Sequence, residues 1–183
     1  MNPSPTKSGD LPLIEPRLEM CEAYREFLQE CIDAGEEGAI FTVPDKIGED
    51  VDGAIRRLQD HARGINLPEG WVPCSAWWML SGEGRLLGEI HVRHRLTPGL
   101  KAFGGQIGYI VRPSERRKGY ATRMLALALD KARSLGLRRV LVTCDPGNDA
   151  SSRVIAKNGG KLEPGVMSVK PPHQRVLRYW IEL

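Results

Sequence analysis

A short basic loop between a strand-like run and an amphipathic helix is the part of the sequence best suited to chemistry. The loop reads Arg116-Arg117-Lys118-Gly119-Tyr120-Ala121. A glycine lets the backbone turn and lets a ligand approach it closely. The first turn of a helix offers N–H groups without partners at the positive end of the helix dipole. The loop and the helix start therefore predict a binding site for a phosphate or a pyrophosphate.

Two common nucleotide-binding motifs are excluded by the residues of this loop. A Walker A motif would end in Gly-Lys-Ser/Thr, which is not found here. The dinucleotide fingerprint Gly-x-Gly-x-x-Gly is missing too, and no acidic ribose-binding residue stands at the expected distance. From the loop alone, an ordinary basic loop ahead of a surface helix remains the alternative.

A second group of candidate residues lies on the alternating segment 85–96. Alternation places Glu89 and His91 on one face together with Arg93, so a carboxylate and an imidazole lie near each other. Either group could act as a general base. The alternative is a hydrated outer face of the sheet with a cross-strand ion pair. Tyr109 could orient a substrate or simply pack. Glu89, His91 and Tyr109 are the candidate catalytic residues.

Length and composition favour one soluble domain. The chain has 183 residues, of which 41% are hydrophobic and 27% charged, enough for a sizeable core. We expect residues 1–10, which are polar, to be a flexible N-terminus and residues 11–183 to form a single domain. The net charge of +3 is mild and does not suggest a nucleic-acid binder. The four cysteines have no zinc spacing and predict no metal site. No signal peptide or membrane span is evident, so we expect a cytoplasmic protein.

Hydrophobic periodicity predicts the elements that would position these residues. A period near 3.6 predicts helices over 18–35, 49–63, about 115–135 and about 148–157. Short apolar or alternating runs predict strands over 11–17, 75–80, 85–96, 106–112, 139–144, 166–169 and 176–182. Residues 97–105 read as a loop. The strand 139–144 should lie parallel to its predecessor across the long helix, as in a βαβ unit.

Two motifs in this order resemble those of the GNAT superfamily of N-acyltransferases. The basic loop resembles its acyl-CoA-binding pattern Gln/Arg-x-x-Gly-x-Gly/Ala. The segment from Asn148 to Gly160 resembles its Asn-x-x-Ala/Ser segment, although Gly160 stands where the family has Phe. The chain also resembles a narrower group of predicted bacterial acetyltransferases of unestablished substrate, in the segments 64–73, 88–94, 107–113 and 178–181.

The resemblance implies a fold and an activity. The fold would be the α/β (α+β) GNAT fold, a mixed and mostly antiparallel sheet with a central splayed pair of parallel strands, flanked by helices. The activity would be direct transfer of an acetyl group from acetyl-CoA to a primary amine of a small molecule or a peptide, without a metal. Homodimers are common in the superfamily, so a homodimer is possible here.

The resemblance also implies which residues bind acyl-CoA. Backbone N–H groups and basic side chains of the loop would hold the pyrophosphate, a backbone N–H near Ile110 or Val111 would face the thioester oxygen, and the Asn148 segment would contact the pantetheine arm. The predicted cofactor-binding residues are Ile110, Val111, Arg112, Arg116, Arg117, Lys118, Gly119, Tyr120, Ala121, Thr122, Asn148 and Ser151. Asn148 can in addition cap a helix.

One departure from the family pattern leaves alternatives open. Many GNAT enzymes carry a Tyr seven residues after the Asn, as the acid for the departing thiolate, and Ile155 occupies that position here. Ser151, Ser152 or a water could take its place. The departure also motivates a rival function, a catalytically inactive CoA-binding sensor or interaction module. Nucleic-acid binding through the basic loop and Arg123 is a third and weaker hypothesis.

Overall fold

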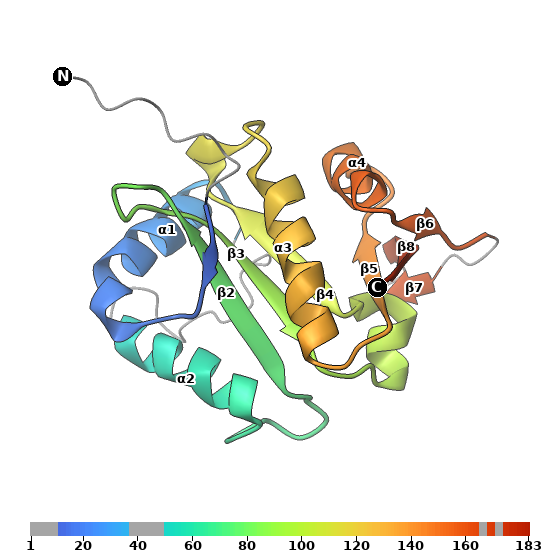
Figure 1. Ribbon diagram of the computed structural model, residues 1–183, viewed down its shortest axis with the longest axis horizontal. Coiled ribbons are helices and arrows are strands. Elements are labelled where there is room, and N and C mark those ends of the chain that lie inside the picture. The colour runs from blue at the N-terminus through green and yellow to red at the C-terminus, as the bar shows by residue number, and fades with distance from the viewer. Residues whose placement is uncertain (1–10, 37–49, 165–167, 171–173) are drawn as a thin grey trace.

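The computed structural model describes residues 11–36, 50–164, 168–170 and 174–183. The predicted flexible N-terminus and residues 166–167 of a predicted strand lie outside these residues. The described residues form a mixed sheet in the order β1-β2-β3-β4-β5-β8-β6, with β7 paired to β8 (Figure 1). The strands are β1 (Leu13–Ile14), β2 (Cys74–Leu80), β3 (Leu86–Arg93), β4 (Ile107–Val111), β5 (Arg139–Cys144), β6 (Lys161–Leu162), β7 (Ser168–Lys170) and β8 (Gln174–Glu182).

Every strand pair is antiparallel except β4 and β5, which run parallel. Their ladder has a single register position, Ile107 opposite Val142. The predicted mixed sheet with a splayed central parallel pair is therefore confirmed.

Helices cover both faces of the sheet and divide the core in two. The helices α1 (Cys21–Asp33) and α2 (Val51–Arg63) pack on one face around Trp78. The helices α3 (Tyr120–Ser134) and α4 (Asp149–Lys157) lie on the other face. In Figure 1, α3 crosses in front of β3 and β4, and α4 stands beside it. Gly88 allows this close packing, because a Cβ there would lie 2.8 Å from Met124 Sδ of α3.

Capping residues explain where several elements begin and end. The Asp50 side chain accepts a hydrogen bond from the Gly53 N–H at the start of α2, and Gly64 ends that helix in a left-handed conformation. Asn148 caps α4 through the Ser151 N–H at 3.0 Å, as predicted. The predicted bounds of β5 and α4 are confirmed.

Several predicted boundaries are wrong. The long helix begins at Tyr120 and not at 115 or 116, because Arg117 and Gly119 have left-handed φ values of 63° and 89°. Before them, Pro113–Glu115 form a single 3-10 turn, η4. The predicted loop 97–105 contains a short π-helix, η3 (Leu100–Gly104). The first strand shrinks to two residues between Pro12 and Pro16, which cannot donate to a ladder. The strand after the hairpin ends at Arg93, and β6 was not predicted.

Within the described part of the chain, no helix combines the length and the apolar character needed to cross a bilayer.

Candidate active site

The strands β4 and β5 are joined by hydrogen bonds at one end of the pair and separate beyond it. The Gln106 N–H donates to Leu141 O at 2.6 Å, and the Leu141 N–H donates to Gln106 Oε1 at 3.1 Å. Gly105 lies so close that a Cβ there would come 2.9 Å from Leu141 O. After Ile107 opposite Val142, the two strands part toward their carboxyl ends.

The register of β3 against β4 decides which amides face the opening. Ile110 lies opposite Glu89, and the Arg112 N–H donates to Leu87 O at 2.9 Å, so the even-numbered residues of β4 bond to β3. Amides of successive strand residues point to opposite edges. The N–H groups of Tyr109 and Val111 therefore point toward β5. Of the two predicted thioester-facing amides, Val111 faces the opening, whereas Ile110 faces β3.

The predicted anion loop lies directly after this opening, between β4 and α3. Its left-handed residues Arg117 and Gly119 turn the backbone twice before α3 begins. Gly119 is the N-cap of α3 and no side chain caps the helix, so its first amides lack an intrahelical acceptor. A Cβ at Gly119 would meet nothing within 4 Å, so a ligand can approach the backbone there.

The basic side chains of the loop do not all face this helix start. The Arg116 guanidinium pairs with both carboxylate oxygens of Glu36 and donates through Nε to Val111 O at 3.2 Å. Lys118 Nζ lies 2.8 Å from Glu115 Oε2. Among the described residues, Arg117 makes no ion pair, so it is the loop cation left to meet an anion.

Arg112, predicted to contact the cofactor, is held by the protein itself. Its side chain is buried, Nε donates to Leu86 O at 2.7 Å, and Nη1 lies 3.0 Å from Glu30 Oε2 of α1. These contacts direct the guanidinium toward α1, which packs on the face of the sheet opposite α3.

The end of α4 lies beside the start of α3. Asn158 Nδ2 donates to Thr122 O at 3.2 Å and to Val154 O at 2.9 Å, which joins the last turn of α4 to the first turn of α3. The predicted residues Thr122, Asn148 and Ser151 are thus carried by two linked helices.

Tyr109 places a hydroxyl on the α3 side of the opening. The hydroxyl is buried and forms no hydrogen bond of normal geometry within the described residues. Burial raises the pKa of Tyr109 to about 12, and the nearby Ser151 hydroxyl only partly offsets this effect. Tyr109 therefore stays protonated at neutral pH and can donate a hydrogen bond, but it does not serve as a base.

Ile155 fills the position where many relatives carry a Tyr. Its side chain is fully buried in the core beneath α4. A Cβ on Gly160 would lie only 2.4 Å from Ile155 Cγ2, so these two residues pack tightly. This position contributes to the core and offers no proton donor.

Glu89 and His91 lie on the buried face beneath α1 and α2. Their side chains are hydrogen-bonded to each other at 2.7 Å, and Trp78 Nε1 donates to Glu89 Oε2 at 2.7 Å. Glu89 has no exposed surface and His91 is 3% exposed. The alternative of a hydrated outer face with a cross-strand pair is therefore wrong, because helices cover this face and the two residues share one strand.

The two side chains form an ion pair. Burial alone would raise the pKa of Glu89 and lower that of His91, but their mutual attraction and hydrogen bonds reverse both effects. The pKa of Glu89 falls below its usual value, and that of His91 rises to about 9. A protonated, enclosed imidazole cannot accept a proton from an amine, and the catalytic role of these residues stays a prediction.

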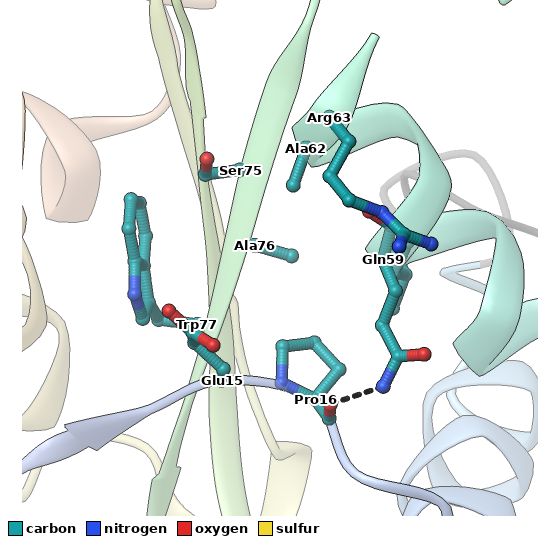
Figure 2. Close-up of a pocket in the computed structure, with 9 residues that line it drawn as sticks. Glu15, Pro16, Gln59, Ala62, Arg63, Ser75, Ala76 and Trp77 are labelled. Carbon is teal, nitrogen blue, oxygen red and sulfur yellow. Dashed lines mark hydrogen bonds between the residues drawn. The ribbon is translucent and has the colours of Figure 1, made fainter. Parts of the chain in front are cut away.

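A cavity of about 350 Å³ lies elsewhere, between α2 and the edge of the sheet at β2. Figure 2 shows Ser75, Ala76 and Trp77 of β2 on one side and Gln59 of α2 on the other, bonded to Pro16 O. None of the predicted site residues lines it. This cavity is therefore separate from the predicted site. In the described ranges, no group of three potential ligands could hold a metal ion.

The sequence model described as "Acetyltransferase (GNAT) domain" matches residues 22–161. The chain belongs to the GNAT acetyltransferase family. A comparison with curated protein sequences finds no significant match.

Solved structures with the same fold include GNAT enzymes with bound cofactor. Mycobacterium smegmatis RimJ in complex with CoA-disulfide is 21% identical, with 96% of this chain and 83% of that chain covered and a TM-score of 0.70. The microcin C7 self-immunity acetyltransferase MccE, in complex with acetyl-CoA and AMP, is 17% identical over 100% and 98% of the two chains, with a TM-score of 0.70. RimL, a ribosomal L7/L12 alpha-N-protein acetyltransferase in complex with coenzyme A, is 19% identical over 97% of each chain, with a TM-score of 0.69.

As a GNAT acetyltransferase, the protein uses acetyl-CoA as its acetyl donor. The residues present fit this cosubstrate, because an uncapped helix start suits a pyrophosphate and the strand opening beside it suits an extended arm.

The Glu89–His91 pair predicts a specific dependence of stability on pH. His91 has a folded pKa of about 9 against 6.5 for a free histidine, so folding favours its protonated form. The contribution of His91 to the free energy of unfolding is complete below pH 6.5 and is lost as the pH rises through about 9. In urea denaturation, the free energy of unfolding should fall less over this range in His91→Gln than in the wild type.

His94→Gln is the matched control for this measurement. The pKa of His94 is lowered by burial, so its contribution changes below pH 6.5 and not above it. This control should lose stability between pH 6.5 and 9 as the wild type does. The same loss in His91→Gln would contradict the ion pair.

Proposed function

We propose that this GNAT enzyme transfers the acetyl group of acetyl-CoA directly to a primary amine of a small molecule or a peptide. The observation that carries the proposal is the uncapped start of α3, placed directly after the strand opening by two left-handed loop residues. A pyrophosphate at the helix start and a thioester at the opening are then within the reach of one extended molecule.

The pyrophosphate would be held mainly by backbone amides between Arg117 and Thr122. These N–H groups lie at the positive end of the helix dipole, and the open space at Gly119 admits a phosphate. Arg117 would add a positive charge to this site, because Arg116 and Lys118 are already paired with carboxylates of the protein. Asn148 and Ser151, at the start of α4, would contact the pantetheine arm.

The thioester oxygen would accept a hydrogen bond from the Val111 N–H. This amide points into the opening, where the single register position leaves β5 unable to pair with it. Negative charge develops on the oxygen as the amine attacks, so a fixed donor stabilises the transition state more than the substrate. Removing one such donor costs roughly 3–4 kcal/mol in other enzymes.

The Tyr109 hydroxyl, with Ser151 beside it, would donate a hydrogen bond to the departing thiolate. Burial raises the pKa of Tyr109 to about 12, so the hydroxyl keeps its own proton. A thiol has a pKa of about 8.5, so the thiolate can leave as the anion, and the proton that the attacking amine loses would reach it through water. The amine must arrive neutral, and neither Glu89 nor His91 is accessible to accept its proton directly.

Support for an amine acceptor comes from the named neighbours. RimL acts on a protein α-amino group by its description, and MccE is described as an acetyltransferase of self-immunity to microcin C7. Neither shows which acceptor this chain uses. The rival function, a CoA-binding module without catalysis, is motivated by the packing role of Ile155.

Binding of acetyl-CoA should raise the melting temperature, whereas NAD should not. A ligand that binds only the folded state stabilises it by about 2.7 kcal/mol at 100 times its Kd. Gly119→Asp should remove the shift, because a side chain is strained at φ 89° and its carboxylate would repel the pyrophosphate. Differential scanning fluorimetry measures each case.

The matched control is Gly136→Asp at the other end of α3. Gly136 is also left-handed, with φ 80° and open space around it, but it lies far from the loop along the helix. This variant should keep the acetyl-CoA shift. Equal shifts with acetyl-CoA in Gly119→Asp and in the control would show that the loop is not the cofactor site.

Turnover separates the enzyme from an inactive CoA-binding module. The purified protein should release free CoA thiol from acetyl-CoA in the presence of at least one primary amine of a panel of peptides and small molecules. A thiol reagent read by absorbance measures the release. Tight acetyl-CoA binding without release across the whole panel would favour the rival.

A further inference from the structure

Glu30, on α1, makes direct contact with the segment that leads from β4 into the anion loop. Its Oε1 accepts the Ser114 backbone N–H at 2.7 Å. Its Oε2 lies 3.0 Å from Arg112 Nη1 and 3.3 Å from Arg85 Nη2. One carboxylate thus contacts the end of β4, the turn η4 and the residue Arg85 before β3.

A second set of contacts extends this support to the middle of the loop. Arg85 Nη1 donates to Glu115 Oε1 at 2.7 Å, and Arg85 Nη2 donates to Ser114 Oγ at 3.1 Å. Glu115 also forms an ion pair with Lys118. Glu30 of α1 and Arg85 therefore hold Arg112, Ser114 and Glu115, and Glu115 links Lys118 to them.

Apart from the Arg116–Glu36 pair and the Arg116 bond to Val111 O, the loop has few other contacts. Its local backbone hydrogen bonds, among the described residues, run from Glu115 N to Arg112 O at 2.9 Å and from Arg116 N to Pro113 O at 3.4 Å. Arg117 is left-handed without being glycine, a conformation that persists only when the surroundings hold it. The contacts with Glu30, together with those of Arg116 to Glu36 and Val111 O, provide such a constraint.

The Arg112 guanidinium explains why the charge of Glu30 matters. Arg112 is 3% exposed, and Glu30 is its carboxylate partner in the structure. A glutamine at position 30 would present an amide group near two guanidinium groups and leave the buried cation without a counter-charge. Breaking a buried pair in this way is far more disruptive than losing an exposed one.

We propose that Glu30 is a positioning residue for acyl-CoA, which holds the pyrophosphate-binding loop in place from the opposite side of the sheet. The inference rests on the proposed function, because it assumes that this loop takes the pyrophosphate. The proposal gives Glu30 no direct contact with the cofactor. Glu30 acts through Ser114 and Arg112, which fix where the loop leaves β4.

Comparison of CoA with pantetheine separates positioning from general stability. Pantetheine has the arm and the thiol of CoA but no pyrophosphate. Glu30→Gln should weaken CoA binding by about tenfold, the factor that corresponds to roughly 1.4 kcal/mol. Its affinity for pantetheine should stay as in the wild type. Calorimetry gives the CoA dissociation constants, and ligand-observed NMR gives those for pantetheine.

Glu26→Gln is the matched control, because Glu26 lies one turn earlier on α1 and is exposed. It should bind CoA within about twofold of the wild type, since exposed charges contribute little. Unchanged CoA affinity in a folded Glu30→Gln would overturn the inference. Equal losses for CoA and pantetheine would overturn it too, because they would indicate a general loosening.

A second variant tests the inference if Glu30→Gln does not fold. Arg85 is 40% exposed, so Arg85→Gln should leave the core intact while it removes contacts to Glu30, Ser114 and Glu115. It should weaken CoA binding by about threefold, and unchanged binding would contradict the inference. Absence of CoA binding in the wild type would instead reject the proposed function itself.

Discussion

The separation of β4 from β5 is the constraint on which the rest of the structure depends. Parallel neighbours in a sheet normally pair along their length, whereas these two meet only at Ile107 and Val142. The close approach at Gly105 and the side-chain bond from Gln106 fasten one end. The other end opens, and the Val111 amide there points toward β5 without a partner strand position. In the proposed function, this gap is the entry route for the extended thioester.

The helices follow from the same geometry. Carboxyl ends of parallel strands lie at one edge of a sheet, so the helices that follow β4 and β5 both begin at that edge. Asn158 joins α4 to the first turn of α3, and Glu30 joins the loop before α3 to α1. The proposed anion site therefore depends on backbone donors held by packing on both faces. Most basic side chains near this site form ion pairs within the protein, since Arg112, Arg116 and Lys118 each have a carboxylate partner.

Local sequence predicts those parts of the fold whose causes are local. The β5 strand is bounded by turn residues, and Asn148 both begins and caps α4, so these elements are placed correctly. The predicted start of α3 is wrong because Glu115 and Arg116 have good helix propensity. The left-handed conformation of Arg117 cannot be predicted from its residue type.

Long-range contacts set what the sequence does not reveal. Alternation places Glu89 and His91 on one face, but the packing of α1 and α2 buries that face and turns the two side chains into an ion pair. Glu30 gives no signal at all, because its partners lie 55, 82 and 84 residues away along the chain. Contacts at such separations become visible only when the sheet has been assembled.

A crystal structure of the protein with CoA tests the central claim most directly. We predict the pyrophosphate oxygens within hydrogen-bond distance of backbone amides between Arg117 and Thr122, with the pantetheine sulfur in the opening beside Val111. Electron density for CoA in the cavity between α2 and β2 (Figure 2), or on any surface away from the loop, would contradict it.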